Sequence, residues 1–160
     1  MPVRISISFW VFILVVVIAH LVLHVAIGLG TAAPDLLTVA VLLAARRLTA
    51  AVAAGVGLLL GLLIDALSLT TFGAAALINS VIGLLGARSR DLFEGDSLLF
   101  VGVYVFLGKW LRDAAYLALT RAATGEPWGA LVTAAPLAAV YAAFAAMVAL
   151  TLYRAAVGDR

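Results

Sequence analysis

Residues 34–68 read PDLLTVAVLLAARRLTAAVAAGVGLLLGLLIDALS, a stretch in which charged residues occur at only three places. Arg46 and Arg47 lie near its middle, whereas Asp35 and Asp65 lie near its two ends. Two apolar helices joined by a basic turn, with one acid at each far end, are typical of a membrane hairpin. The stretch therefore predicts two lipid-facing spans that run in opposite directions.

The composition of the whole chain also requires a membrane. Of the 160 residues, 66% are hydrophobic and 11% are charged, whereas soluble domains carry about 25% charged residues. One small core cannot hide this much apolar surface from water, so we expect the lipid bilayer to be the solvent. The net charge is only +2, and we expect no nucleic-acid partner. The chain has no cysteine, which excludes disulfides, thiolate metal sites and cysteine nucleophiles.

Six apolar segments predict an all-α, polytopic membrane helix bundle that forms one domain over residues 1–160. They are Ile5–Ile27, Pro34–Ala45, Ala50–Leu67, Phe72–Ala87, Leu98–Leu119 and Ala130–Tyr153. A helix needs about 20 residues to cross the hydrocarbon, so the second and fourth segments are short. We expect them to lie partly buried among the other helices or to extend at their ends; a re-entrant pair is the alternative. The first segment is longer than the h-region of a signal peptide and is expected to stay uncleaved.

The arginines orient these spans. If the N-terminus is cytoplasmic, that side holds most of the arginines outside the spans, and only Arg121 lies on the other side. The cytoplasmic set is Arg4, Arg46, Arg47, Arg88, Arg90, Arg154 and Arg160. The positive-inside rule therefore places both termini in the cytoplasm. On the same side, Asp96 is the expected N-cap of the fifth helix.

The fifth span carries a polar face. Lys109, Arg112, Asp113 and Tyr116 occupy positions i, i+3, i+4 and i+7, which lie on one side of a helix. At 1.5 Å per residue, Lys109 lies roughly 17 Å into the span, and Arg112 and Asp113 lie roughly 22 Å in. These charges are therefore expected in the outer half of the bilayer.

Four further side chains are expected at the same depth: His20, His24, Asp35 and Asp65. Charges inside membrane spans usually face the bundle interior and pair with one another, so we expect this polar cluster to hold the helices together. A docking surface or ligand cavity is the alternative, and a catalytic site is a weaker one. The two histidines have metal-ligand spacing, but no HExxH glutamate follows. We expect neither a metal nor a cofactor.

Small residues mark two places for close helix packing. Gly57, Gly61 and Asp65 follow one another at i+4 steps, and a GxxxG surface lets another backbone approach closely. The sixth span presents several alanines on one side, for which packing inside the bundle is expected and docking of a partner helix is the alternative. They are Ala138, Ala142, Ala145, Ala146 and Ala149. Asn79 is expected to form one interhelical hydrogen bond.

The order of motifs in the first half of the chain resembles the MreD family of bacterial rod shape-determining membrane proteins. The family pattern has an outer Pro-Asp before a leucine-rich span, a basic turn, a glycine-rich span that ends in Asp, and a fourth span with glycine. These features correspond here to PDLL (34–37), Arg46-Arg47, GVGLLLGLLIDALS (55–68) and TTFGAAALINSVIGLLG (70–86). The resemblance covers about a third of the chain.

This resemblance implies an accessory, non-catalytic role in the machinery that builds lateral peptidoglycan at the bacterial inner membrane. It implies binding to MreC, a bitopic protein with a periplasmic domain, and through MreC a connection to MreB, RodA and the elongation transpeptidase. The fold of the family is likened to the substrate-binding subunits of ECF vitamin transporters. We expect Asp35 and Asp65, which match motif positions, to matter for assembly. The outer polar cluster and the Gly57–Gly61 surface are expected to receive the membrane helix of MreC and its juxtamembrane region.

Two other functions stay open from the sequence. A substrate-binding subunit of an ECF-type transporter would hold a small vitamin in the outer cavity, but the first helix lacks the small-xxx-small motif through which such subunits usually dock. A small intramembrane enzyme acting on lipid would need His20, His24 or Asp113 at a water-accessible site, and the chain has no catalytic motif.

Overall fold

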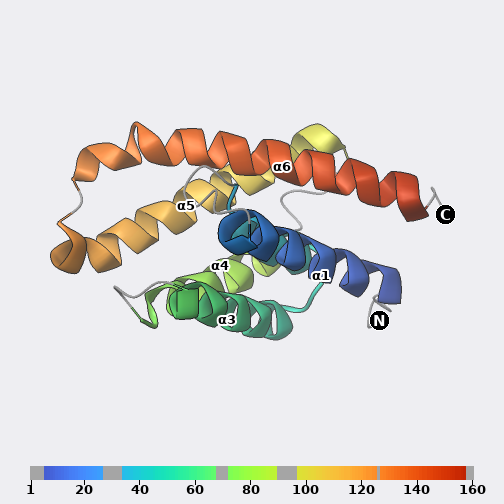
Figure 1. Cartoon of the computed structure of the whole chain (residues 1–160), viewed down its shortest axis with the longest axis horizontal. Helices are drawn as coiled ribbons and strands as arrows, with labels where there is room; N and C mark the ends of the chain where they lie inside the picture. Colours follow the sequence, from blue (N-terminus) through green and yellow to red (C-terminus); the bar gives the residue numbers. More distant parts are fainter. Residues whose placement is uncertain (1–5, 27–33, 68–71, 90–96, 126, 158–160) are drawn as a thin grey trace.

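The computed structural model describes residues 6–26, 34–67, 72–89, 97–125 and 127–157, and the statements below concern these residues. They form α-helices joined by short turns, and this part of the chain contains no strand (Figure 1). The elements are α1 (Ile7–Leu21), η1 (Val22–Ala26, a π-helical turn), α2 (Leu36–Ala45), α3 (Ala50–Leu67), α4 (Ala74–Ser89), α5 (Leu98–Thr124), η4 (Trp128–Leu131, a 3-10 turn) and α6 (Ala134–Val157). The prediction of an all-α fold is confirmed.

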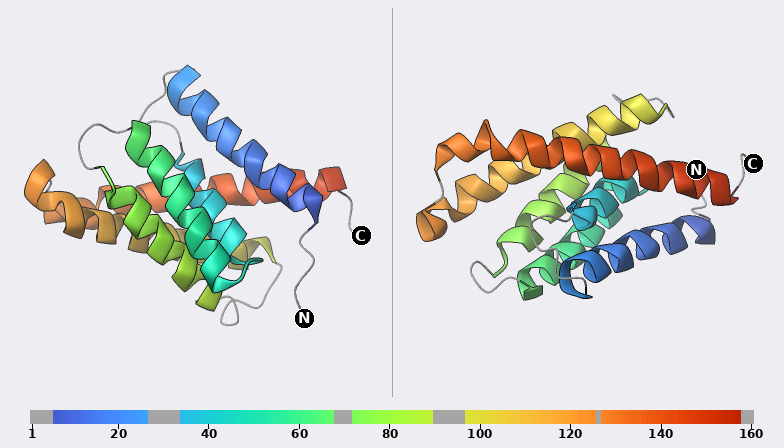
Figure 2. Two further views of the ribbon diagram at one scale, coloured as in Figure 1. Left: turned by 90° about the horizontal axis from the view of Figure 1, so that it is seen from below. Right: turned by 45° about the horizontal axis from the view of Figure 1, so that its top comes forward.

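Two helix pairs and a central helix make up the bundle. Helices α3 and α4 pack along their length as one antiparallel pair, and α5 and α6 form a second pair (Figure 2). Helix α2 lies between them and contacts all five other α-helices. The start of α1 and the end of α6 lie at the same end of the molecule (Figure 1), where Ile7 and Val157 line one groove.

Helix α2 is the most enclosed element of the bundle. All ten of its residues are buried, and its length of about 15 Å is half the thickness of the hydrocarbon core. It begins where Asp35, directly after Pro34, caps it by accepting the Thr38 N–H. Near its other end the carbonyl of Leu42 accepts a hydrogen bond from the Tyr104 hydroxyl at 3.1 Å. Because other helices surround it, the expectation of a lipid-facing span is wrong for α2, whereas the expectation that this short segment lies buried among the other helices is confirmed.

Helix α3 buries small side chains and exposes large apolar ones, which is the reverse of an amphipathic helix in water. Its buried positions are a stripe of small residues ending in Asp65, whereas Leu58 and Leu59 are exposed. Large apolar side chains on the outside and small ones inside suit a helix that faces lipid and packs closely on its inner side. Three segments are long and apolar enough to span a membrane: Ile7–His24, Ala50–Leu67 and Trp128–Val157.

The remaining helices are harder to assign as membrane spans. Helix α5 has 27 residues, about 40 Å, but it carries the charges of Lys109, Arg112 and Asp113. Helices α2 and α4 have 10 and 16 residues, so the number of crossings stays a prediction. The N-cap of α5 is Ser97, whose Oγ accepts the Phe100 N–H at 3.3 Å; the predicted cap, Asp96, lies outside the described residues.

Candidate functional site

Lys109 on α5 joins the polar face of its own helix to the start of α2. Its Nζ lies 2.7 Å from Asp113 Oδ2 and 3.2 Å from Asp35 Oδ2, and the lysine is buried. Asp35 also accepts hydrogen bonds from the Thr38 backbone N–H at 3.1 Å and from the Thr38 hydroxyl at 2.7 Å. One carboxylate therefore both caps α2 and pairs with a buried cation.

Arg112 extends this arrangement to α4. Its Nη1 lies 3.1 Å from Asp113 Oδ1, and its Nε donates to Asn79 Oδ1 at 3.4 Å. The guanidinium also lies over the Tyr116 ring, 4.7 Å from its centroid. The predicted interhelical hydrogen bond of Asn79 is thereby confirmed. Because every one of these charged groups has a partner, the cost of burying them is largely offset.

We refer to these residues as the polar network: Asp35, Thr38, Asn79, Lys109, Arg112 and Asp113. It contains two carboxylates and two cations, so its formal charge is zero. It joins α2, α4 and α5. Such an arrangement ties three helices together and fixes their relative rotation.

The two histidines lie beside this network at the end of α1. Their rings stack with centroids 3.9 Å apart, and the imidazole of His20 lies near the backbone of Pro34 and near Asp35. The Nδ1 atoms of His20 and His24 are buried and have no partner among the described residues. Within this part of the chain, no three His, Cys, Asp or Glu side chains come together to hold a metal ion. Stacking pairs the ring faces, an arrangement unlike two histidines converging on one ion.

Asp65 has a different local role, which the sequence analysis did not assign to it. Its carboxylate accepts the backbone N–H groups of Ala75 at 3.1 Å and Ala76 at 2.9 Å, in the first turn of α4. The side chain is only 1% exposed. An acid at the end of α3 therefore satisfies two donors that the start of α4 cannot pair by itself, and it meets the positive end of the α4 dipole.

The Gly57–Gly61 surface is occupied within the chain. A Cβ on Gly57 would overlap the backbone carbonyl of Asn79, and a Cβ on Gly61 would overlap the backbone of Ala76. From the other side, a Cβ on Gly83 would overlap the carbonyl of Ala53. The predicted close approach is confirmed, but the backbone that approaches is α4. The expectation that this surface receives the helix of a partner is wrong, because α4 already fills it.

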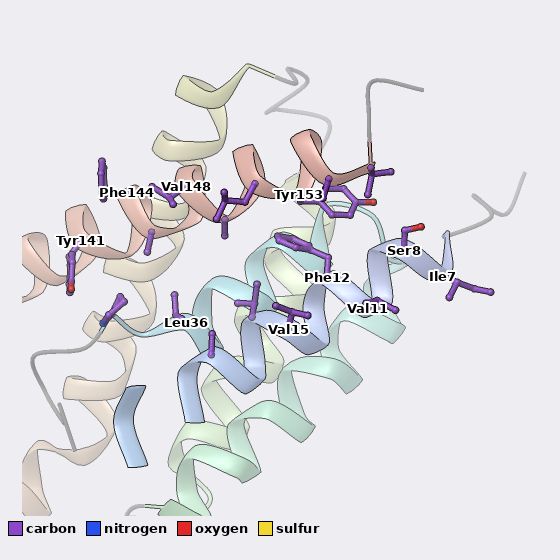
Figure 3. Close-up of a pocket in the computed structure, with 18 residues that line it drawn as sticks. Ile7, Ser8, Val11, Phe12, Val15, Leu36, Tyr141, Phe144, Val148 and Tyr153 are labelled. Atoms are coloured by element: carbon purple, nitrogen blue, oxygen red, sulfur yellow. The ribbon is translucent and has the colours of Figure 1, made fainter. Parts of the chain in front are cut away.

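An open apolar groove lies between α1 and α6 instead (Figure 3). It has a volume of about 820 Å³, and the rings of Phe12 and Tyr153 contact each other at its lining with centroids 4.6 Å apart and planes tilted by 37°. For the alanines of the sixth span, packing inside the bundle is confirmed for two residues, and docking of a partner helix stays a prediction. Ala142 and Ala146 are buried in the bundle, whereas Ala145 and Ala149 line this groove; Ala138 lies on the exposed side.

The match to a known protein family covers the part of the chain that carries Asp35, Asp65 and Lys109. The model of the family described as rod shape-determining protein MreD matches residues 3–111, which is more than half of the chain. Curated proteins and solved structures gave no match, so the likeness to ECF substrate-binding subunits stays a prediction. A match of this extent shows that the chain belongs to the MreD family of rod shape-determining membrane proteins.

Proposed function

We propose that this protein is a non-catalytic, multi-pass component of the rod complex in the bacterial inner membrane, where it binds MreC and helps organise lateral peptidoglycan synthesis. Membership of the MreD family implies a role in rod shape determination. Through MreC the protein would connect to MreB, RodA and the elongation transpeptidase. The polar network supports a structural role, because its charged groups bind one another.

The basic residues support an orientation with both termini in the cytoplasm. The Arg47 guanidinium lies 5.3 Å from the centroid of the Phe9 ring, near the start of α1, and the Arg46 guanidinium lies 5.8 Å from that of Tyr104. Arg154 follows Tyr153, which stacks on Phe12. The arginines of the α2–α3 turn thus gather at the end where α1 begins and α6 ends, as the positive-inside rule requires.

The observation that carries MreC binding is the groove between α1 and α6. It extends along α1 from Ile7 to Ala19 and along α6 from Tyr141 to Val157, which is about 18 Å on the shorter side. A helix about 10 Å wide and 18 Å long occupies about 1,400 Å³. The groove of about 820 Å³ therefore suits a helix sunk to roughly half its width.

The lining of the groove suits a membrane helix. Ala145 and Ala149 are spaced i, i+4 and would let a partner backbone approach, as small residues do between membrane helices. The second surface of small residues, at Gly57 and Gly61, is already filled by α4. We therefore place the single membrane helix of MreC in the groove between α1 and α6.

Filling the groove tests this proposal. The variant Ala149→Trp places an indole in the groove, and Leu59→Trp places one on α3, where Leu59 is 67% exposed and outside the groove. We expect Ala149→Trp to lower the amount of co-purified MreC by about tenfold, which corresponds to about 1.4 kcal/mol, and Leu59→Trp to leave it unchanged. Equal yields of MreC with both variants would remove the groove from this role.

Cross-linking gives a second, independent readout. The chain has no cysteine, so a single cysteine at position 149 can be paired with a series of cysteines along the MreC membrane helix. Disulfides that recur every three to four residues would show a helix lying against Ala149. Cross-links of equal strength from a cysteine at position 59 would contradict the proposed position.

A further inference from the structure

A second groove lies between α4 and α5, away from the α1–α6 groove. Its volume is about 410 Å³. Its apolar lining residues are Leu42, Ile82, Leu85, Leu107 and Leu111. Two glycines, Gly86 and Gly108, form its floor, and a Cβ at either would meet a neighbouring side chain, the hydroxyl of Tyr104 or the end of Leu42. The two glycines therefore let Tyr104 and Leu42 pack closely against the helix backbones beside the groove.

One end of this groove is polar and basic. Arg88, Ser89 and Tyr104 line it there, and Arg88 is exposed. The guanidinium of Arg46 lies over the Tyr104 ring, 5.8 Å from its centroid. Arg46 in the α2–α3 turn and Arg88 near the end of α4 therefore lie at the tyrosine end of this apolar groove. This end is the one predicted to lie at the cytoplasmic surface.

The length of the groove indicates what kind of molecule fits it. Its lining extends along α5 from Tyr104 to Leu111 and along α4 from Ile82 to Ser89, about 10 Å in each case. The hydrocarbon of one leaflet is about 15 Å thick. The groove thus lies within one leaflet and is too short to accompany a helix that crosses the membrane. A lipid in that leaflet extends over a depth similar to the length of the groove.

We propose that this groove binds an anionic phospholipid, with one acyl chain along α4 and α5 and the phosphate at the mouth beside Arg46 and Arg88. Basic pockets between membrane helices on the cytoplasmic side are suited to anionic head groups. A guanidinium donates two parallel hydrogen bonds to phosphate oxygens, and the arginines would supply these donors, because the Tyr104 and Ser89 hydroxyls at the same end already donate to the carbonyls of Leu42 and Gly86. The site is separate from the proposed MreC surface and does not depend on it.

The binding of phosphatidylglycerol to the purified protein in detergent tests this inference. Native mass spectrometry counts the bound lipid, and phosphatidylcholine with the same acyl chains is the neutral probe. The variant Arg88→Gln removes one cation at the mouth. Its control is Arg121→Gln, because Arg121 lies over Trp128 and outside the groove. We expect Arg88→Gln to weaken phosphatidylglycerol binding about fivefold and Arg121→Gln to leave it unchanged.

A second pair of variants tests the apolar part of the groove. Leu107→Trp fills it, whereas Leu99→Trp adds the same side chain to α5 at an exposed position outside it. We expect the bound lipid to be lost in Leu107→Trp and retained in Leu99→Trp. Equal retention of phosphatidylcholine and phosphatidylglycerol would overturn the proposal, as would equal effects of Arg88→Gln and Arg121→Gln.

The MreC readout separates this inference from the proposed function. If Arg88→Gln and Leu107→Trp lose the lipid but still co-purify MreC, the groove is a lipid site. If they lose MreC and bind lipid as before, the groove is a protein interface and the lipid site is overturned. Failure of Ala149→Trp to affect MreC would contradict only the proposed function.

Discussion

Replacing Asp65 with leucine should lower the free energy of unfolding by about 2–4 kcal/mol. The carboxylate of Asp65 accepts two backbone N–H groups in the first turn of α4, from Ala75 and Ala76. A hydrogen bond to a charged group contributes about 1.5–3 kcal/mol, and a buried donor left without a partner costs about 1–3 kcal/mol. Removal of one buried charge offsets part of this loss.

A graded series makes the test sharper. In Asp65→Asn the amide oxygen can still accept one N–H group, and Asn is as good an N-cap as Asp. We therefore expect Asp65→Asn to lose about half as much stability as Asp65→Leu. The control is Leu59→Ala on the exposed side of α3, which should have little effect. Reversible unfolding of the purified protein in mixed micelles with increasing SDS gives the free energy for each variant.

The result would also separate two explanations of why Asp65 matters. If the acid acts as a cap, stability falls first and MreC is lost only to the extent that the protein unfolds. If Asp65→Leu has the stability of the wild type within about 0.5 kcal/mol, the typical range for an inert surface substitution, the cap argument is refuted. Loss of MreC in a variant of full stability would instead place Asp65 at the partner interface.

Three further predictions follow from the packing and the charges. Lys109→Met should destabilise the protein by about 1.5–3 kcal/mol in the same SDS titration, because two partly buried carboxylates lose a cation and Asp113 keeps only Arg112; a smaller loss than that of the Leu59→Ala control would contradict the pairing. Gly61→Leu should prevent α3 and α4 from packing and abolish the monodisperse peak in size-exclusion chromatography, whereas Gly55→Leu, where a Cβ has open space, should be tolerated. In intact cells an impermeant maleimide should label a cysteine at position 129 but not one at position 49; the reverse pattern would invert the proposed orientation.

Much of the fold followed from local patterns in the sequence. The lengths of the apolar runs gave the helices to within a few residues, because lipid favours helices wherever about 20 apolar residues occur together. The spacing of Lys109, Arg112 and Asp113 predicted a shared face, and the depth estimate put Asp35 at the same level. In the structure Lys109 Nζ lies 3.2 Å from Asp35 Oδ2, a specific pair that the sequence analysis did not assign.

The features that could not be predicted depend on which helices pack against each other. A GxxxG pattern shows that some backbone approaches closely, but only the tertiary arrangement shows that α4 fills Gly57 and Gly61. The bond from Tyr104 to the Leu42 carbonyl joins residues 62 positions apart, and no local signal marks it. The two grooves likewise arise from gaps between helices that are distant in the sequence. These features need contacts across the bundle, which a single sequence does not reveal.

The unequal lengths of the outer helices have a consequence for the surrounding bilayer. Helices α3 and α4 have 18 and 16 residues, whereas α5 and α6 have 27 and 24. Their lengths are therefore about 24–27 Å on one side of the protein and about 36–40 Å on the other. If all four helices cross the bilayer, lipids beside the short pair would have to thin the membrane, and those beside the long pair would have to thicken it or let the helices tilt. The hydrocarbon would then be thinner on one side of the protein than on the other, and neighbouring proteins with short spans would gather on the thinner side.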